Sequence, residues 1–420
     1  MKNFKNLFLA GTAIFALAAC SNDDGISINE PGELFDENTK TWVNLNLTAA
    51  DLQTRVTDKA TLGIDGESDI TSGLVVISNK PGEVILEKKL SKDNFNGSEV
   101  NFALPGLLDN YEYGLTFIAN PQDGLSLEGE MIKESTIQLA NIVDDQSSFE
   151  FMMVNAKRSA ADAKYTLMMN DKNSATNPAK PQFNGSTTEE IKVDRLESAL
   201  TVVEDEKLEV TFELPKEVDH LVVTNFLPMN IRKNVYVQPR YSKDGNHIVT
   251  PELDKTNRGD LVVNKVEEIY KNASSYAFTK PEVFVPIVEN NTAIIKEGLK
   301  KTGKKGYTTG AIIEVTACDK AGAPVTFKNG DVEYPEGKMY YSYFLVDGQK
   351  DIYTVIRNKG YQLEVDKIAD FGANTPGGDL DEDNTGEIDP EELIDSEKLY
   401  VTVKVTPLDW LFEANKITLK

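Results

Sequence analysis

One acidic stretch of the chain, DEDNTGEIDPEE at residues 381–392, has the residue types and spacing of a twelve-residue calcium loop. Oxygen ligands would stand at positions 1, 3, 5 and 12, a glycine at position 6 and an aliphatic residue at position 8: Asp381, Asp383, Thr385, Glu392, Gly386 and Ile388. Position 5 prefers Asp or Asn, and the flanking residues fit a strand and a linker instead of two helices. We therefore interpret the stretch as a solvated acidic linker and predict no metal site.

Residues that could carry out catalysis are few. The histidines are His220 and His247, and neither lies in a motif that would make it a general base or a metal ligand. The sequence contains no G-x-S-x-G nucleophile turn, no H-E-x-x-H zinc motif and no glycine-rich phosphate loop. The sequence therefore predicts a protein that is not an enzyme and needs no cofactor.

An aromatic cluster in the C-terminal half could stack against a sugar; its members are Tyr340, Tyr341, Tyr343 and Phe344. The same residues fit a strand that presents rings to both faces of a sheet, because successive side chains of a strand alternate. We favour the strand, and the sugar-binding interpretation remains as an alternative.

The N-terminus has the pattern of a secretory signal. Lys2 and Lys5 precede an apolar run from Leu7 to Leu17, and Leu17-Ala18-Ala19-Cys20 then resembles a lipobox. We expect a signal peptide at residues 1–19 and a covalent lipid on Cys20, with Ser21 directing the precursor to the outer membrane. Cys318 is then the remaining thiol, and its strand-like surroundings predict a buried core residue.

Composition limits the classes of partner. The formal charge of −24, from 44 basic and 68 acidic side chains, argues against nucleic acid and against an anionic membrane surface. An apolar content of 40% in 420 residues is enough for a sizeable core.

Many short β-type runs, separated by Gly, Pro, Asn and Asp, predict a mostly antiparallel β protein with two tandem sandwiches and a boundary near residue 200. A few short helices are expected among the strands, and the best helix candidate in the first half covers residues 131–145. The predicted strands are 73–78, 83–90, 98–105, 111–120, 149–155, 191–203, 207–214, 220–227, 235–241, 310–318, 338–346, 351–368 and 398–405.

An earlier strand, TWVNLNL at residues 41–47, is followed within eight residues by Arg55. Its alternation places Val43, Leu45 and Leu47 on one face. Burying these three side chains is worth roughly 5 to 9 kcal/mol before entropy costs. Such a value is comparable to the net stability of a whole domain, so loss of this strand would leave an open apolar groove.

Several blocks together resemble the fimbrillin family, the type V pilins assembled from lipoprotein precursors. The blocks are the lipobox at Cys20, WVNLNLTAADLQTRVTD, LTFIAN (115–120), IKVDRLESALTVV (191–203), YTVIRNKGYQLEVDKIADFG (353–372) and YVTVKVTPLDWLFEANKITL (400–419). In such pilins the last block has the form V-x-V-x-V-x-P-W. Here Leu408 and Asp409 separate Pro407 from Trp410, which is a departure from that form.

The resemblance implies two transthyretin-like β-sandwich domains and cleavage between Arg55 and Val56 by an arginine-specific surface protease. It divides the chain into a lipidated propeptide carrying the groove strand, an N-terminal domain, a C-terminal domain and a donor segment: 20–55, 56–200, 201–397 and 398–420. Donor-strand exchange would insert the last segment of one subunit into its neighbour, with Val401, Val403 and Val405 on one face. The other interpretation is that this segment is simply the last strand of its own domain.

Residues 373–397 contain no apolar run, so we expect this loop to swing away from the body at little energetic expense. A contact of this kind does not close and generates filaments. The resemblance thus implies a fimbrial shaft subunit at the cell surface, used in adhesion and biofilm formation, with pilin subunits and a host or bacterial receptor as partners. The alternative is a surface-tethered glycan-binding lipoprotein that keeps its lipid, with Arg55 as an incidental linker residue.

Overall fold

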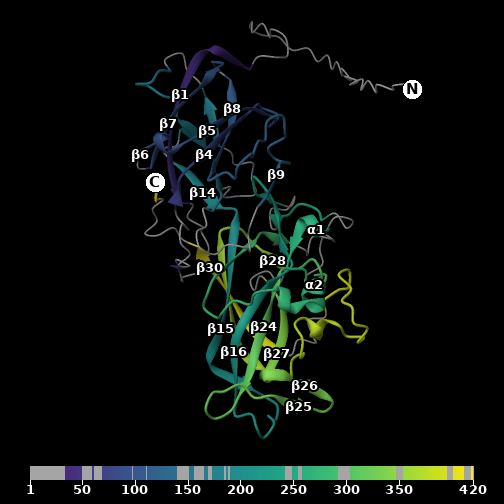
Figure 1. Cartoon of the computed structure of the whole chain (residues 1–420). Coiled ribbons are helices and arrows are strands. Elements are labelled where there is room, and N and C mark those ends of the chain that lie inside the picture. The colour runs from purple at the N-terminus through teal and green to yellow at the C-terminus, as the bar shows by residue number, and fades with distance from the viewer. Residues whose placement is uncertain are drawn as a thin grey trace, which may run out of the picture. The chain divides into compact units, whose positions relative to one another are not determined.

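Strands dominate the computed structural model of the chain, so the prediction of a mostly β protein built from sheets is confirmed (Figure 1). The structure describes residues 34–49, 59–60, 69–96, 98–109, 111–139, 151–155, 165–168, 173–183, 186–187, 190–241, 248–253, 258–291, 303–346, 353–394, 401–410 and 418–419. Residues 35–420 form one compact unit. Within the described ranges, no helix is long and apolar enough to cross a membrane.

The largest sheet has 11 strands in the order β13-β12-β11-β8-β10-β14-β1-β7-β6, with β4 paired to both β8 and β5. β1 and β7 run antiparallel, whereas β1 and β14 run parallel. The strands are β1 (Phe35–Ala49), β4 (Gly73–Ser78), β5 (Val84–Leu90), β6 (Phe95–Asn96), β7 (Glu99–Leu107), β8 (Glu112–Ala119), β10 (Met153–Asn155), β11 (Tyr165–Met168), β12 (Pro181–Phe183), β13 (Ser186–Thr187) and β14 (Ile191–Arg195).

Two further sheets pack face to face as a sandwich, because the inner side chains of both belong to one buried cluster. One sheet has the order β2-β30-β29-β15-β22 and the other β16-β24-β27. Their strands are β2 (Lys59–Ala60), β15 (Glu197–Val210), β22 (Val285–Val288), β29 (Lys359–Ile368), β30 (Val401–Trp410), β16 (His220–Met229), β24 (Gly310–Cys318) and β27 (Lys338–Phe344). Part of the outer face of β16-β24-β27 is covered by helix α2 (Val266–Lys271).

Short strand pairs and helical turns complete the fold. The pairs are β3 (Asp69–Ile70) with β31 (Thr418–Leu419), β9 (Thr136–Gln138) with β18 (Asn234–Tyr236), β17 (Ile231–Arg232) with β21 (Val262–Val263), β19 (Arg240–Tyr241) with β20 (Ile248–Val249), β23 (Asn290–Asn291) with β28 (Thr354–Val355), and β25 (Phe327–Asn329) with β26 (Val332–Tyr334). The helical segments are α1 (Arg258–Leu261), η1 (Lys92–Asn94), η2 (Ala273–Ser275), η4 (Pro335–Gly337) and η5 (Gly378–Leu380).

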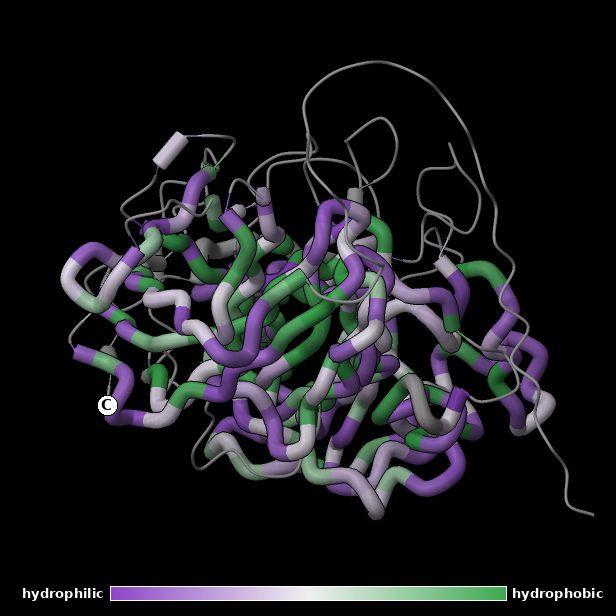
Figure 2. Tube along the Cα trace, turned by 90° about the horizontal axis from the view of Figure 1, so that it is seen from above, coloured by the Kyte–Doolittle hydropathy of each residue, from purple (hydrophilic) through white to green (hydrophobic). Residues whose placement is uncertain are grey.

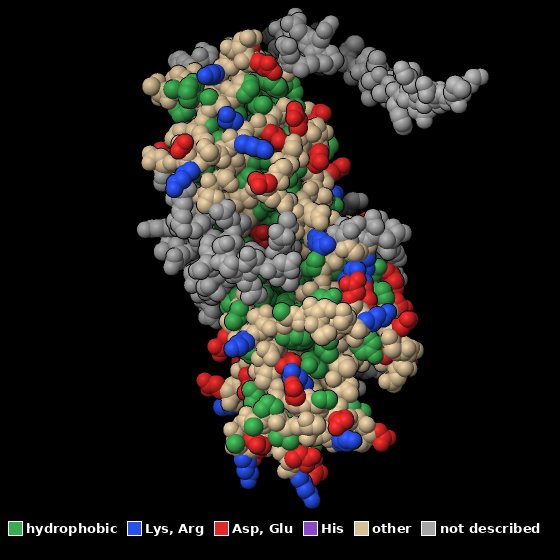
Figure 3. All heavy atoms as spheres, in the orientation of Figure 1, with side chains coloured by type: hydrophobic (Ala, Val, Ile, Leu, Met, Phe, Trp, Pro, Cys, Tyr) green, Lys and Arg blue, Asp and Glu red, His purple; other side chains and the backbone are tan. Residues whose placement is uncertain are grey.

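Hydrophobic segments run through the interior and hydrophilic segments lie outside them (Figure 2). On the face drawn in Figure 3, acidic and basic side chains are interspersed instead of being gathered into areas of one sign.

The strands predicted at 73–78 and 310–318 match β4 and β24 residue for residue. The helix predicted at 131–145 is wrong over residues 131–139, and its remainder lies outside the described residues. Residues 131–134 form a turn, and 136–138 form β9, in which Ile137 is buried and paired opposite Val235. Pairing with β18 thus overrides the helical spacing of the apolar residues. The boundary near residue 200 remains a prediction.

Charged side chains are buried where β14 ends and β15 begins. Arg357 forms a bidentate ion pair with Glu289, with Nε–Oε2 and Nη2–Oε1 distances of 2.9 and 3.1 Å. Arg195 donates to Asn358, and Asn358 donates to Asp194 at 3.0 Å. We call Asp194, Arg195, Glu197, Glu289 and Arg357 the junction cluster, and all five are at most 9% exposed. Removing one member would leave a buried charge without compensation, which is strongly destabilising.

Burial raises the pKa of Glu197 from 4.5 to about 7, because the desolvation of its carboxylate outweighs the attraction of Arg195 and Arg357. The native state therefore binds a proton at Glu197 more tightly than the unfolded chain does. The resulting stabilisation is fully present below pH 4.5 and is lost as the pH rises through about 7.

Glu197→Gln should remove this pH dependence. In the unsubstituted chain we expect the Glu197 contribution to the free energy of unfolding to fall by about 3 kcal/mol between pH 4.5 and 8. This value is the free-energy equivalent of raising the pKa of Glu197 from 4.5 to about 7. Urea unfolding at pH 5 and pH 8 measures the difference. The matched control is Glu209→Gln at an exposed position of β15, which should leave the pH slope unchanged. An equal slope in the Glu197 variant would contradict the assignment.

Candidate functional site: the groove occupied by β1

The inward face of β1 is apolar and fully enclosed. Val43, Leu45 and Leu47 are at most 1% exposed, whereas Trp42, Asn44 and Asn46 on the opposite face are half-buried. The strict alternation of TWVNLNL explains this division, since successive side chains of a strand point to opposite faces.

Strand β7 forms the first wall of the space that β1 occupies. Val43 lies opposite Phe102 and Leu45 opposite Val100, and these β7 side chains are at most 3% exposed. At one end, the Leu107 N–H donates to the hydroxyl of buried Thr41 at 2.7 Å. At the other end, the Leu47 N–H donates to the Ser98 carbonyl at 2.9 Å.

Residues 173–179 form the second wall, on the opposite edge of β1. The Asn173 side chain accepts from the Trp42 N–H at 2.8 Å and donates to the Trp42 carbonyl at 2.9 Å. Ala179 continues this pairing: its N–H donates to the Trp42 carbonyl at 2.8 Å, and its carbonyl accepts from the Asn44 N–H at 3.0 Å. Beyond this point β14 takes over, with Leu47 opposite Ile191.

β1 therefore joins two parts of its sheet. In the described structure, β7 and β6 connect to the rest of the 11-stranded sheet only through β1 (Figure 1). We call the space between β7 on one side and residues 173–179 with β14 on the other the β1 groove. Without β1 it would expose an apolar floor and two unpaired backbone edges, which is the template for adding another strand.

Several sequence-predicted site residues lie outside the described residues: Cys20, Arg55, Val56 and His247. The described part of β1 ends at Ala49, six residues before Arg55. His220 is described, and its imidazole lies 3.3 Å from the carboxylate of the neighbouring Asp219 at an exposed position.

The expected donor strand, β30, lies in its own sheet in this structure. It pairs antiparallel with β29, with Val401 opposite Ile368, Val403 opposite Val365 and Val405 opposite Leu363. Val401 is 4% exposed, and Val403 and Val405 pack against the sandwich core. In this arrangement β30 is part of its own sheet, as the interpretation as a last strand of its own domain expects. Its use as a donor strand remains a prediction.

The chain just past the expected cleavage point runs beside the C-terminal segment. β2 pairs in parallel with β30, and β3 pairs in parallel with β31. The partners are Lys59 with Asp409 and Ile70 with Leu419, so the offset is 350 residues (409 − 59) at one pair and 349 residues (419 − 70) at the other. The two described pairings therefore differ by one residue in register.

The expectation that residues 373–397 swing freely is wrong for 373–394. The buried Lys305 ammonium donates to Glu392, to the Leu380 carbonyl and to Glu382 at 2.8, 3.0 and 3.2 Å. Leu380 and Ile388 belong to the apolar cluster that includes α2. Composition misled the prediction because isolated apolar residues and one buried lysine anchor this segment without any apolar run.

The same segment covers the outer edge of β27. Tyr340 and Ala373 exchange backbone hydrogen bonds of 2.8 and 3.0 Å, and Asp379 accepts from the Ser342 N–H at 2.6 Å. Burial raises the pKa of Asp379, although its hydrogen bonds with Ser342 act in the opposite direction.

The residues of the calcium-like stretch bind protein donors. Asp381 accepts from Tyr270, Thr385 and Gly386 at 2.9, 3.0 and 2.9 Å. Desolvation acts to raise the pKa of Asp381, but these hydrogen bonds lower it overall. Glu392 pairs with Lys305, and among the described residues no group of three or more potential ligands comes together.

The aromatic cluster forms β27, as the favoured interpretation predicts. Tyr341 and Tyr343 pack on the sandwich core, and Tyr340 and Phe344 pack on the other face beneath α2. Tyr340, Tyr341 and Phe344 are at most 9% exposed. Because these rings are enclosed, they offer no platform on which a sugar could stack. Cys318, as predicted, is a buried free thiol.

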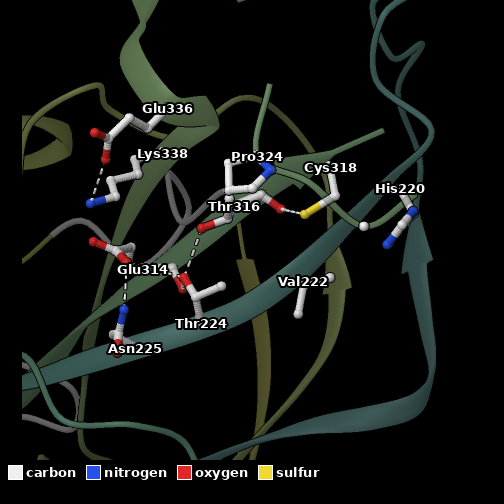
Figure 4. A pocket seen from close by; sticks show the side chains of 11 residues that line it. His220, Val222, Thr224, Asn225, Glu314, Thr316, Cys318, Pro324, Glu336 and Lys338 are labelled. Carbon is white, nitrogen blue, oxygen red and sulfur yellow. Dashed lines mark hydrogen bonds and ion pairs between the residues drawn. The ribbon is translucent and has the colours of Figure 1, made fainter. Parts of the chain in front are cut away.

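A hollow of about 460 Å³ lies on the part of the β16-β24-β27 outer face that includes Glu314 (Figure 4). The Glu314 carboxylate accepts from Asn225 at 2.6 Å and from Thr224 and Tyr340 at 3.1 Å. A bulge in β16 between Val223 and Asn225 places both Thr224 and Asn225 beside it. With three protein donors already bound, Glu314 is poorly placed to act as a general base.

Sequence reasoning missed the second wall of the β1 groove. Asn173 and Ala179 lie in a polar, turn-rich stretch, and their part in the groove depends on a contact between residues 131 positions apart. No local pattern carries that information.

The C-terminal region matches the model of one protein family, "Major fimbrial subunit protein type IV, Fimbrillin, C-terminal", over residues 332–416. This region includes β27, β29 and β30. No curated protein matches the chain in sequence.

Solved structures resemble the chain weakly. A proposed cell adhesion protein of Bacteroides eggerthii is 12% identical, covers 90% of this chain and 98% of its own, and has a TM-score of 0.48. A proposed cell adhesion protein of Parabacteroides distasonis is 13% identical, with coverages of 88% and 97% and a TM-score of 0.47. The tip fimbrial protein Mfa3 of Porphyromonas gingivalis, truncated at its C-terminus, is 14% identical, with coverages of 89% and 100% and a TM-score of 0.41. The family match thus shows that residues 332–416 are similar to the C-terminal region of fimbrillins.

Proposed function

We propose that this chain is the precursor of a structural subunit of a cell-surface fimbria. It is exported as a lipoprotein anchored to the outer membrane by Cys20, cleaved between Arg55 and Val56, and polymerised by donor-strand exchange. The observation that carries this proposal is the position of β1, an apolar strand bonded along both edges and connected to the candidate cleavage site.

The energetics of β1 support a removable strand. Val43, Leu45 and Leu47 together contribute roughly 5 to 9 kcal/mol of burial, so the precursor is stable while β1 is in place. Once the chain is cut at Arg55, β1 is held by non-covalent contacts alone. A second strand of equal apolar character can then replace it, because the backbone bonds lost and gained are alike.

The C-terminal segment is the candidate replacement. β30 presents Val401, Val403 and Val405 toward the sandwich core, which is the alternation that the β1 groove accepts. Transfer of β30 to a neighbour would leave its own sheet with a new edge at β29. Each subunit would thus both donate and accept a strand, and the contact would repeat head to tail without closing.

The partners that follow from this proposal are other pilin subunits, an arginine-specific protease and a host or bacterial surface receptor. The fimbria would serve adhesion and biofilm formation, and the subunit would act structurally instead of catalytically. No cofactor is required apart from the lipid on Cys20 of the precursor.

Arg55→Ala should block maturation. Full-length precursor should accumulate at the outer membrane, because the new N-terminus at Val56 is never produced. N-terminal sequencing of surface-extracted protein and electron microscopy of filaments measure the effect. The matched control is Lys59→Ala, which removes a nearby basic residue and should leave Val56 as the N-terminus. Normal filaments from the Arg55 variant would contradict the cleavage step.

A disulfide that ties β30 to β29 should stop polymerisation reversibly. Glu364 and Lys404 lie opposite each other, so Glu364→Cys with Lys404→Cys places two thiols within bonding reach. The oxidised mature protein should remain monomeric, and reduction should restore polymers on a non-reducing gel. Either single substitution serves as the control. Polymers formed equally well by the oxidised double variant would exclude β30 as the donor.

A further inference from the structure

The β1 groove also specifies the register of the strand that replaces β1, an inference that rests on the proposed function. We propose that the C-terminal segment of a second copy of this chain docks with Val401, Val403 and Val405 at the positions of Val43, Leu45 and Leu47. In this register Thr402 takes the place of Asn44, and Pro407 takes the place of Ala49.

The second wall cannot choose the register by itself. The hydrogen bonds that Asn173 and Ala179 form with β1 go to the backbone N–H and carbonyl groups of Trp42 and Asn44. Any residue except proline offers these groups, so this wall would hold an incoming strand whatever its side chains are. The choice must come from the other contacts of the groove.

The apolar floor restricts the incoming strand to steps of two residues. Positions 43, 45 and 47 are at most 1% exposed, so they exclude Lys404 and accept the valines on the opposite face of the segment. Three registers keep at least two valines in the groove. They place Val401, Val403 or Leu399 at position 43.

A register with Val403 at position 43 would place Pro407 at position 47. There the Leu47 N–H donates to the Ser98 carbonyl at 2.9 Å. Proline has no N–H, so this register would leave the end of the β7 ladder unbonded. With Val401 at position 43, Pro407 instead lies at position 49, beyond the β7 ladder, which pairs no further than Asn46 with Glu99 and the Leu47–Ser98 bond.

A register with Leu399 at position 43 would place Glu397 at position 41. Thr41 is 2% exposed, and its hydroxyl accepts from the Leu107 N–H. A carboxylate at this enclosed position would have to be desolvated. With Val401 at position 43, the apolar Leu399 occupies the site instead. Only the Leu107 N–H, at the last residue of β7, then loses its hydroxyl acceptor.

Disulfide trapping across β7 distinguishes the three registers. Asn44 and Asn101 lie opposite each other on the outer face, with their side chains bonded at 2.7 Å. In polymers, Asn101 of the acceptor faces Thr402 of the donor in the proposed register, Tyr400 in the register with Leu399 at position 43, and Lys404 in the register with Val403 there. Diagonal neighbours are too far apart to bond efficiently.

The experiment uses mature protein carrying Asn101→Cys together with Tyr400→Cys, Thr402→Cys or Lys404→Cys, polymerised and then oxidised. We expect a covalent ladder from the Thr402 variant, at least tenfold more intense than the ladders from the other two. The precursor with Asn44→Cys and Asn101→Cys is the control, because it should form an internal disulfide and so verify the geometry and folding.

The outcomes separate the two hypotheses. A dominant ladder from the Tyr400 or Lys404 variant would overturn the register while supporting donor-strand exchange. Filaments without any covalent ladder would also overturn it, since another strand would then occupy the groove. Absence of polymers from the unsubstituted mature chain would instead refute the proposed function itself.

Discussion

A strand that is hydrogen-bonded along both edges holds two parts of a sheet together, whereas an edge strand can be lost without dividing the sheet. β1 has this position, with β7 along one edge and residues 173–179 followed by β14 along the other. Its three inward side chains fill the space between these walls. In the described structure, the 11-stranded sheet is therefore continuous only while some strand occupies the groove. Every step of the proposed assembly depends on which strand that is.

The features of this arrangement that arise from local sequence patterns can be predicted from the sequence. The alternation of TWVNLNL predicts an inward face of Val43, Leu45 and Leu47, and burial divides the strand in that way. The short β-type runs at 73–78 and 310–318 likewise predict β4 and β24 to the residue, and both strands are buried on both faces. Local pattern and tertiary packing agree in these segments.

Long-range contacts explain what could not be predicted. Residues 136–138 have helical spacing of apolar side chains but pair with β18, about a hundred residues away. The second wall of the groove depends on Asn173, whose partner is equally remote. The acidic segment 373–394 contains no apolar run, yet Lys305 and the cluster beneath α2 fix it in place. In each segment the deciding partner is absent from any local window of sequence.

The cover over β27 has a consequence for how such a chain avoids errors. Both edges of the β16-β24-β27 sheet are occupied: β27 by Ala373 and Asp379, and β16 by Thr279 and the Glu204 carboxylate. A molecule that joins its copies by strand pairing would otherwise aggregate at any open edge it offered. Side chains and short loop bridges seal both edges of this sheet, so it offers no open edge for such pairing. In the proposed fimbria, covering these edges would disfavour sideways joining of subunits through this sheet.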